Sequence, residues 1–305
     1  MDLRNAQYRQ SAYMTQEAVK ISYFNAVATR ELVRVEQDRV RRQEDQLSFV
    51  NQQLELGRAT RSDVLRSQVD LNNAKVALLR ADNSARNAQY ALAEAVGVTE
   101  PLEPDAAAEM DAAPFTWDKA ELMMMALSGA PGLVSARAQA EADQAAVASA
   151  KSAYLPSLRF SGGWAWANSE FPPQNRSWSL SLSGSYPLFN GFTRENQLYS
   201  AKARADQSRS AERATDLQLR KDMDGAYGTT VAAQASRGLA EQTVELSRED
   251  LRVSQERYRL GLATILDLQT AQITLLQAEV DLIRAQFDYQ LGLARLEALL
   301  GTDLR

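Results

Sequence analysis

The sequence predicts a mainly α-helical protein with one β-hairpin, in which long antiparallel helical hairpins arose by internal duplication. Three observations predict this fold class. All eight prolines lie between Pro101 and Pro187, so residues 1–100 and 188–305 lack the residue that most strongly breaks helices. A shift of 204 residues along the chain aligns two similar segments. Within the proline-bearing middle, apolar and polar residues alternate with the period of a β-strand.

The duplication pairs residues 57–97 with residues 261–301 without a gap, and 13 of the 41 pairs are identical. The identical pairs include Gly57/Gly261, Ala59/Ala263, Thr60/Thr264 and Asp63/Asp267. Because the period is far longer than that of solenoid repeats, each copy is a large structural half. The first copy has no counterpart of the lead-in that precedes the second copy at residues 118–202. We therefore expect an N-terminally truncated first copy.

Each copy carries an apolar seven-residue repeat beside a row of small residues, a pattern typical of closely packed coiled-coil helices. In the second copy the two rows are Leu268, Leu275, Leu282, Tyr289, Leu296 and Ala271, Ala278, Ala285, Gly292, Leu299. The proline-free stretches 1–56 and 194–260 predict rods of about 80 Å and about 100 Å at 1.5 Å per residue. Because an average globular helix has about 11–12 residues, rods of this length argue against a compact domain.

One short turn joins each of the two rods to the helix that follows it. Gly57 and Gly261 stand where a rod ends, at the position that favours a left-handed backbone conformation. The pattern Thr-x-x-Asp follows each glycine and predicts a capping box, with threonine at the N-cap and aspartate at the third helical position. Each copy is therefore expected to form a long helical hairpin with a tight turn.

The middle of the chain predicts a β-hairpin with one apolar face. Around a turn rich in helix breakers at 171–175, the runs 158–167 and 178–186 alternate with a period of two. The large apolar residues expected on the shared face are Phe160, Trp164, Trp166, Trp178, Leu180, Leu182 and Tyr186. Such a face fits a soluble sheet that covers a core, or a transmembrane hairpin that contacts lipid. The membrane interpretation is favoured, because no nearby segment offers an apolar surface to cover the face.

The composition argues against several classes of function. The chain has no cysteine and no histidine, so it contains no disulfide, no thiolate zinc site and no Ser-His or Cys-His catalytic pair. A formal net charge of −5 argues against a nucleic-acid surface, which is strongly basic. The sequence has no P-loop, and no run approaches the roughly 18 apolar residues of a membrane helix. We expect no enzymatic activity, no cofactor and no bound metal.

The chain resembles the TolC-type outer-membrane efflux family over its whole length. The most specific stretches are 155–158 (Leu-Pro-Ser-Leu), 186–191 (Tyr-Pro-Leu-Phe-Asn-Gly) and 258–282, together with the Gly-x-Ala-Thr turns. The resemblance implies a homotrimer in the Gram-negative outer membrane, in which three protomers share one β-barrel that continues as an α-helical tunnel into the periplasm. The family has two β-hairpins per protomer, whereas this sequence shows one.

On this basis the chain divides into five segments. They are a first-copy helical hairpin (1–97), a linker (98–117), mid-tunnel helices of the second copy (118–153), a transmembrane β-hairpin (154–191) and a second-copy helical hairpin (192–305).

The resemblance also implies which residues carry the function. The turns meet a periplasmic adaptor protein, and the implied docking residues are Leu56, Gly57, Arg58, Ala59, Thr60, Leu260, Gly261, Leu262, Ala263 and Thr264. Nearby, Asp63 and Asp267 align with acidic positions of the pore constriction, and Tyr258 aligns with a tyrosine that bonds to the neighbouring hairpin. A ring of carboxylates favours cations. Each residue also has a structural interpretation, since both aspartates stabilise helix N-termini and Tyr258 packs against its neighbours.

Two hypotheses about function follow. In the first, the protein is a passive outer-membrane exit duct of a tripartite efflux or type I secretion system, which works with an adaptor, an inner-membrane pump and outer-membrane lipid. In the second, it is a soluble periplasmic coiled-coil module without channel activity. An adaptor flanks its hairpin with compact β-rich domains, whereas the flanks here are a second helix pair and an aromatic-faced β-hairpin. The sequence therefore favours the duct.

Overall fold

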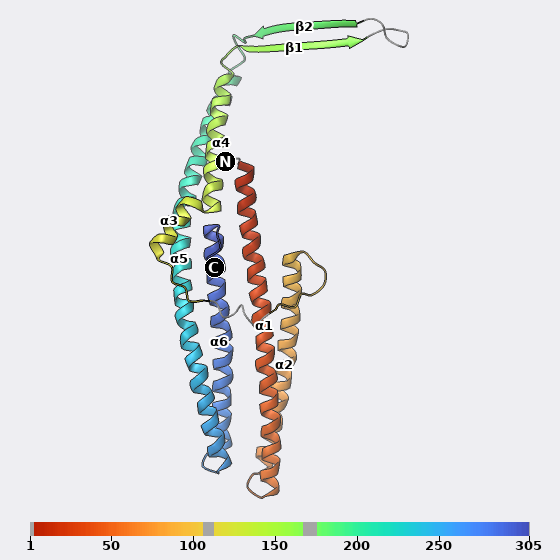
Figure 1. The fold of residues 1–305 in the computed structure, drawn as a ribbon, viewed down its shortest axis with the longest axis vertical. Helices are drawn as coiled ribbons and strands as arrows, with labels where there is room; N and C mark the ends of the chain where they lie inside the picture. Colours follow the sequence, from red (N-terminus) through yellow and green to blue (C-terminus); the bar gives the residue numbers. More distant parts are fainter. Residues whose placement is uncertain (1–2, 106–112, 167–175, 305) are drawn as a thin grey trace. The chain divides into compact units, whose positions relative to one another are not determined.

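The computed structural model describes residues 3–105, 113–166 and 176–304. Long helices account for most of these residues, and two strands form one hairpin (Figure 1). In chain order the elements are α1 (Leu3–Glu55), α2 (Arg61–Val96), α3 (Lys119–Gly129), α4 (Pro131–Ser152), β1 (Ser157–Trp166), β2 (Arg176–Ser185), α5 (Thr193–Arg259) and α6 (Ile265–Leu300). The predicted rods at 1–56 and 194–260 are confirmed as α1, with 53 residues, and α5, with 67 residues.

The chain divides into two units, and the division passes through α5. One unit comprises Met1–Gln7 and Gly132–Gln218, and the other comprises Tyr8–Pro131 and Leu219–Arg305. The second unit contains the helical hairpin of α1 and α2 and the helical hairpin of α5 and α6, including both turns. The predicted division into five segments is a finer one and stays a prediction. Among the described residues, no helix combines the length and the apolar character needed to cross a membrane.

The two helical hairpins have apolar cores made largely of leucine, valine and alanine. Between α5 and α6 the buried cluster contains Val244, Leu251, Leu268, Ala271, Leu275 and Ala278. Between α1 and α2 a smaller cluster contains Ala26, Ala88 and Leu92. Four members of the rows predicted for the second copy, Leu268, Ala271, Leu275 and Ala278, therefore lie in the core. Small residues in one row let the helix backbones approach closely, as the heptad pattern predicts.

The predicted β-hairpin is confirmed as an antiparallel pair of ten-residue strands. Its register pairs Trp164 with Trp178 and Phe160 with Leu182. Because residues opposite each other in a strand pair share a face, these four apolar side chains lie on one face of the hairpin. Serine residues predominate on the other face, where the hydroxyls of Ser161 and Ser181 are 2.8 Å apart. The predicted turn at 171–175 lies outside the described residues.

Candidate functional site at the helical hairpin turns

The turn between α1 and α2 is built from a left-handed glycine and a capping box. Gly57 has φ of 72°, in the region that residues with a Cβ atom rarely adopt. The backbone N–H of Thr60 donates to the Asp63 carboxylate over 2.8 Å, and the backbone N–H of Asp63 donates to the Thr60 hydroxyl over 3.2 Å. The capping box predicted at this turn is therefore confirmed.

The turn between α5 and α6 repeats this geometry. Gly261 also has φ of 72°. The Thr264 backbone N–H donates to the Asp267 carboxylate over 2.8 Å, and the Asp267 N–H donates to the Thr264 hydroxyl over 3.2 Å. The second predicted capping box is thus confirmed as well. The two turns adopt one backbone design because the duplication kept the glycine, the threonine and the aspartate.

Both capping carboxylates are held in the ionised form. Hydrogen bonds from the backbone and hydroxyl of Thr60 lower the pKa of Asp63, and the charge of Arg66 adds to the effect. The backbone and hydroxyl of Thr264 lower the pKa of Asp267 in the same way, with a contribution from Arg257. Donors that bind the charged form of a carboxylate favour that form. The capping role is therefore visible in the structure, and the role in a pore constriction stays a prediction.

Tyr258, near the end of α5, lies where the two helical hairpins meet. Its ring packs on the α5–α6 core cluster and lies edge-on to Phe49 of α1, with ring centroids 5.8 Å apart. Burial raises the pKa of Tyr258, and the negative charge of Asp63 raises it further. The charge of Asp63 in the first copy thus acts on Tyr258 in the second. The packing interpretation of Tyr258 is confirmed, and its role in gating stays a prediction.

The outward side chains distinguish the two turns. Arg58 and Arg61 are exposed at the first turn. Leu262, which corresponds to Arg58, is 67% exposed at the second, whereas the corresponding residues Leu56 and Leu260 are exposed at both turns, at 65% and 71%. A partner that contacts both turns therefore meets an exposed leucine at each, and it meets Arg58 at the first turn where it meets Leu262 at the second.

Sequence reasoning missed a set of polar contacts that join the two helical hairpins. The side-chain amides of Gln43 on α1 and Gln272 on α6 share a buried hydrogen bond of 2.9 Å. The amide of Gln269 donates to the carboxylate of Asp70 on α2. A heptad pattern relates positions within one copy, so it carries no signal for contacts between copies. The interruption of an apolar helix face by glutamine was the one indication that the sequence offered.

The membrane-facing prediction stays a prediction, but the exposure of the residues is clear. Phe160, Trp164, Trp178, Leu180, Leu182 and Tyr186 are between 51% and 73% exposed. The side chain of Trp166 lies outside the described residues. Within the described part of the chain, carboxylates do not gather into a group of three that could hold a metal ion.

Long paired helices with capped turns, together with a β-hairpin that exposes one apolar face, define a class of protein built from helical rods and a two-stranded sheet. Comparisons with known proteins specify this class. The family described as "Outer membrane efflux protein" matches residues 122–302, which is more than half of the chain. The chain belongs to the outer membrane efflux protein family, and this confirms the resemblance drawn from its sequence.

Relatives and solved structures agree with the family assignment. The outer membrane protein TolC of Vibrio cholerae is 27% identical over 289 residues, a match that covers 89% of this chain and 63% of that protein. Protein CyaE of Bordetella pertussis is 26% identical over 266 residues, covering 84% of this chain and 56% of CyaE. The chain thus spans less than two thirds of the length of these relatives.

The solved structures establish the fold. The outer membrane protein VceC of Vibrio cholerae aligns with a TM-score of 0.77 at 22% identity, covering 99% of this chain and 73% of VceC. The CmeC outer membrane channel of Campylobacter jejuni aligns with a TM-score of 0.81 at 14% identity, covering 98% of this chain and 65% of CmeC. The predicted fold class is confirmed, and the family is located in the outer membrane with its helical part in the periplasm.

Proposed function

We propose that the chain is part of a passive exit duct that conducts substrates from the periplasm to the exterior in a tripartite efflux or type I secretion system. The observation that carries the proposal is the exposed apolar face of β1 and β2. Phe160 and Trp164 are 68% and 67% exposed on this face. Outer-membrane lipid would cover such a face, whereas a soluble coiled-coil adaptor would leave it in water.

The duct would form by association of three copies of the chain. The α5 helix exposes Leu239, Leu246 and Val253 at intervals of seven, and Leu260, directly after the helix, continues this spacing. The α2 helix exposes a second apolar row, namely Leu65, Val69, Val76 and Leu79. A seven-residue apolar repeat is the surface on which a neighbouring helix packs. We propose that these rows meet between copies and close a helical tunnel.

The two turns would form the docking and constriction end of the tunnel. A periplasmic adaptor would contact the exposed residues at both turns and link the duct to an inner-membrane pump. Repetition of Asp63 and Asp267 around three copies would place a ring of carboxylates near the turns. Because both carboxylates have lowered pKa values, the ring stays negative at neutral pH and favours cations.

Tryptophan fluorescence in lipid vesicles tests the proposal. We expect brominated lipid to quench Trp164 and Trp178, because the apolar face of the β-hairpin would lie in the hydrocarbon layer. A variant that keeps Trp117 as its one tryptophan is the matched control, since Trp117 precedes α3 in the helical unit and is expected to escape quenching. No quenching of Trp164 and Trp178 would favour the soluble alternative, and equal quenching of Trp117 and Trp164 would contradict an insertion limited to the β-hairpin.

A further inference from the structure

A groove of about 970 Å³ runs along the contact between α5 and α6 and reaches the first part of α1, all within the second unit. Its lining includes the buried residues Ala226 and Ala233 of α5 and Ala285 and Gly292 of α6. A Cβ atom at Gly292 would lie 2.6 Å from the Thr230 hydroxyl, so glycine lets the two helices approach closely here. A groove of this size can take a small molecule.

Small residues line the α5 side of the groove. Gly225, Thr229 and Ser236 recur at intervals of four and seven residues, so they lie along one face of the helix, and all three are exposed. The space beside Gly225 is open, because a Cβ atom there would meet no other atom within 4 Å. The duplicated positions of Gly225 and Ser236 in α1 carry the larger residues Ile21 and Leu32. The open side of the groove is therefore particular to the second copy.

Charged residues line the α6 side of the groove. Asp281, Asp288 and Arg295 recur at intervals of seven residues and are exposed. At 1.5 Å per residue, each is about 10 Å from the next along the helix axis. The duplicated positions of α2 are uncharged, namely Ala77, Ser84 and Ala91. The second copy thus combines small residues on one helix with these charges on the other, a combination that the first copy lacks.

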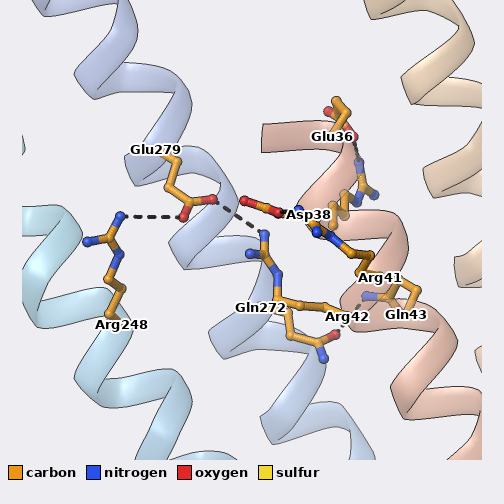
Figure 2. A network of polar contacts seen from close by, with 9 residues as sticks. Glu36, Asp38, Arg41, Arg42, Gln43, Arg248, Gln272 and Glu279 are labelled. Atoms are coloured by element: carbon orange, nitrogen blue, oxygen red, sulfur yellow. Dashed lines mark hydrogen bonds and ion pairs between the residues drawn. The ribbon is translucent and has the colours of Figure 1, made fainter. Parts of the chain in front are cut away.

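The charges in the groove differ from the charge that precedes them on α6. Just before the groove, Glu279 pairs with Arg42 of α1 at 3.4 Å and with Arg248 of α5 at 4.0 Å (Figure 2). That carboxylate is neutralised by its own protein. Asp288 and Arg295 form no ion pair with any residue that the structure describes. Their charges are therefore available to a ligand.

The end of the groove that lies farther from the turns is cationic where it is open to solvent. Lys221 of α5 and Arg295 of α6 are both exposed there. Two carboxylates share this end, but Glu17 and Asp222 are half-buried, and Asp222 takes part in a polar contact of its own. This end therefore suits an anionic group of a ligand.

The end nearer the turns is acidic. Asp281 and Asp288 are exposed and outnumber Arg284, which lies between them on α6. The side-chain amide of Gln277 donates to the Asp281 carboxylate over 2.9 Å, which leaves Asp288 as the more available carboxylate. A ligand that spans from Asp288 to Arg295 thus meets a negative charge and a positive charge about 10 Å apart.

We propose that the groove binds a short zwitterionic peptide in extended form, with its amino group at Asp288 and its carboxylate at Arg295. An extended chain advances by about 3.3–3.6 Å per residue, so a tripeptide spans about 10 Å between its charged ends. The guanidinium of Arg295 can bind the carboxylate through two hydrogen bonds. Peptide side chains lie over the alanines of the floor and beside the small residues of α5. The inference does not depend on the proposed duct, because binding requires no transport.

Isothermal titration calorimetry of the protein with trileucine tests the proposal. We expect Asp288→Asn and Arg295→Gln each to weaken binding by about tenfold or more, because each removes a hydrogen bond between charged groups. Trileucine that is acetylated at its N-terminus has no ammonium group, so Asp288→Asn should leave its affinity unchanged. Trileucine that is amidated at its C-terminus should bind equally to the protein and to Arg295→Gln. A structural role of either residue would weaken all three peptides alike.

Two further variants complete the test. Gly225→Ile places the residue of the first copy in the open space of the groove and is expected to weaken all three peptides. Asp250→Asn makes the same chemical change as Asp288→Asn at an exposed position of α5 outside the groove, and it should leave binding unchanged. Absence of trileucine binding, or equal affinity for the protein, Asp288→Asn and Arg295→Gln, would overturn the proposal. Peptide binding without channel conductance would contradict the duct and leave the groove assignment intact.

Discussion

The two copies of the duplicated helical hairpin have the same backbone conformation at their turns and differ in side chains. Both turns place glycine at φ of 72° and close with a Thr-x-x-Asp capping box. On this common frame Arg58 of the first copy corresponds to Leu262 of the second. The difference shows that local geometry was kept where the backbone requires particular residues. Positions that point outward were free to acquire different side chains. We propose that the docking partner distinguishes the two turns by this difference.

The copies also differ away from the turns. The buried residue Ala93 of the first copy corresponds to Glu297 of the second. Glu297 accepts a hydrogen bond of 2.6 Å from Lys20 and another of 3.1 Å from the Leu304 backbone. Lys20 also pairs with Asp303, which follows α6. The second copy is therefore anchored to α1 by a charged contact that the first copy lacks.

Removal of this anchor is expected to give the largest effect on stability. Lys20→Met leaves the Glu297 carboxylate, 8% exposed, without its cation and should lower the free energy of unfolding by about 2–3 kcal/mol. Burial lowers the pKa of Lys20, but the bonds to Glu297 and Asp303 outweigh burial and raise it. The stabilisation is therefore complete below the unfolded pKa of about 10.4 and is lost as pH rises through the folded pKa.

Chemical denaturation at several pH values measures this contribution. Lys119→Met is the matched control, because Lys119 pairs with Asp224 at an exposed site. We expect the control to leave the unfolding midpoint unchanged. A Lys20→Met protein as stable as the control at pH 7 would contradict the anchoring role.

The capping boxes are expected to give intermediate and equal effects in the two copies. Thr60→Ala and Thr264→Ala should each lower the free energy of unfolding by about 1 kcal/mol, since each removes an N-cap hydroxyl. Thermal unfolding checks this, with Thr270→Ala as the control because the Thr270 hydroxyl bonds to a carbonyl of its own helix. A loss confined to one copy would show that the turns are less alike than their backbones indicate.

The same capping boxes make the stability of the fold depend on pH. The folded pKa values of Asp63 and Asp267 are lowered, so their stabilisation is present above the unfolded pKa of about 3.9. It is lost as pH falls through the folded values. We expect Asp63→Asn and Asp267→Asn to flatten the acid limb of a pH–stability curve, and an unchanged acid limb would contradict the capping interpretation.

The smallest expected effect distinguishes the two aspartates. Asp63→Asn removes the charge that helps to raise the pKa of Tyr258, so that pKa should fall toward the ordinary value of about 10. Asp267→Asn should leave it unchanged. Carbon NMR of the tyrosine rings, with Tyr258→Phe for assignment, measures both. Equal shifts for the two variants would contradict an electrostatic effect on Tyr258 that is specific to Asp63.

Local rules predicted much of the fold. Proline placement, glycine at the turns and the Thr-x-x-Asp pattern act over a few residues, so they could be interpreted directly from the sequence. The β-hairpin followed from its period of two, which the register of Trp164 opposite Trp178 confirms. The predicted strands began one or two residues late, since the alternation of apolar and polar residues does not mark the first residue that pairs with the neighbouring strand.

Contacts between the copies could not be predicted in the same way. Gln68 and Gln272 are identical residues at duplicated positions, yet Gln68 is exposed and Gln272 is 8% exposed. The difference arises because α6 packs against α1 at this level, and heptad spacing does not reveal which helix is the neighbour. The family resemblance assigned Asp63 and Tyr258 to the same end of the tunnel without pairing them, and the Glu279 contacts appeared only in the structure.

Single-channel conductance measures whether the protein forms an exit duct and whether Asp267 contributes to its selectivity. The protein would be reconstituted in a planar bilayer with a salt gradient across it. We expect stepwise conductance with a reversal potential that favours cations, and a weaker preference in Asp267→Ala. Unchanged selectivity in Asp267→Ala would remove Asp267 from the constriction. The absence of any stepwise conductance would contradict the exit duct itself.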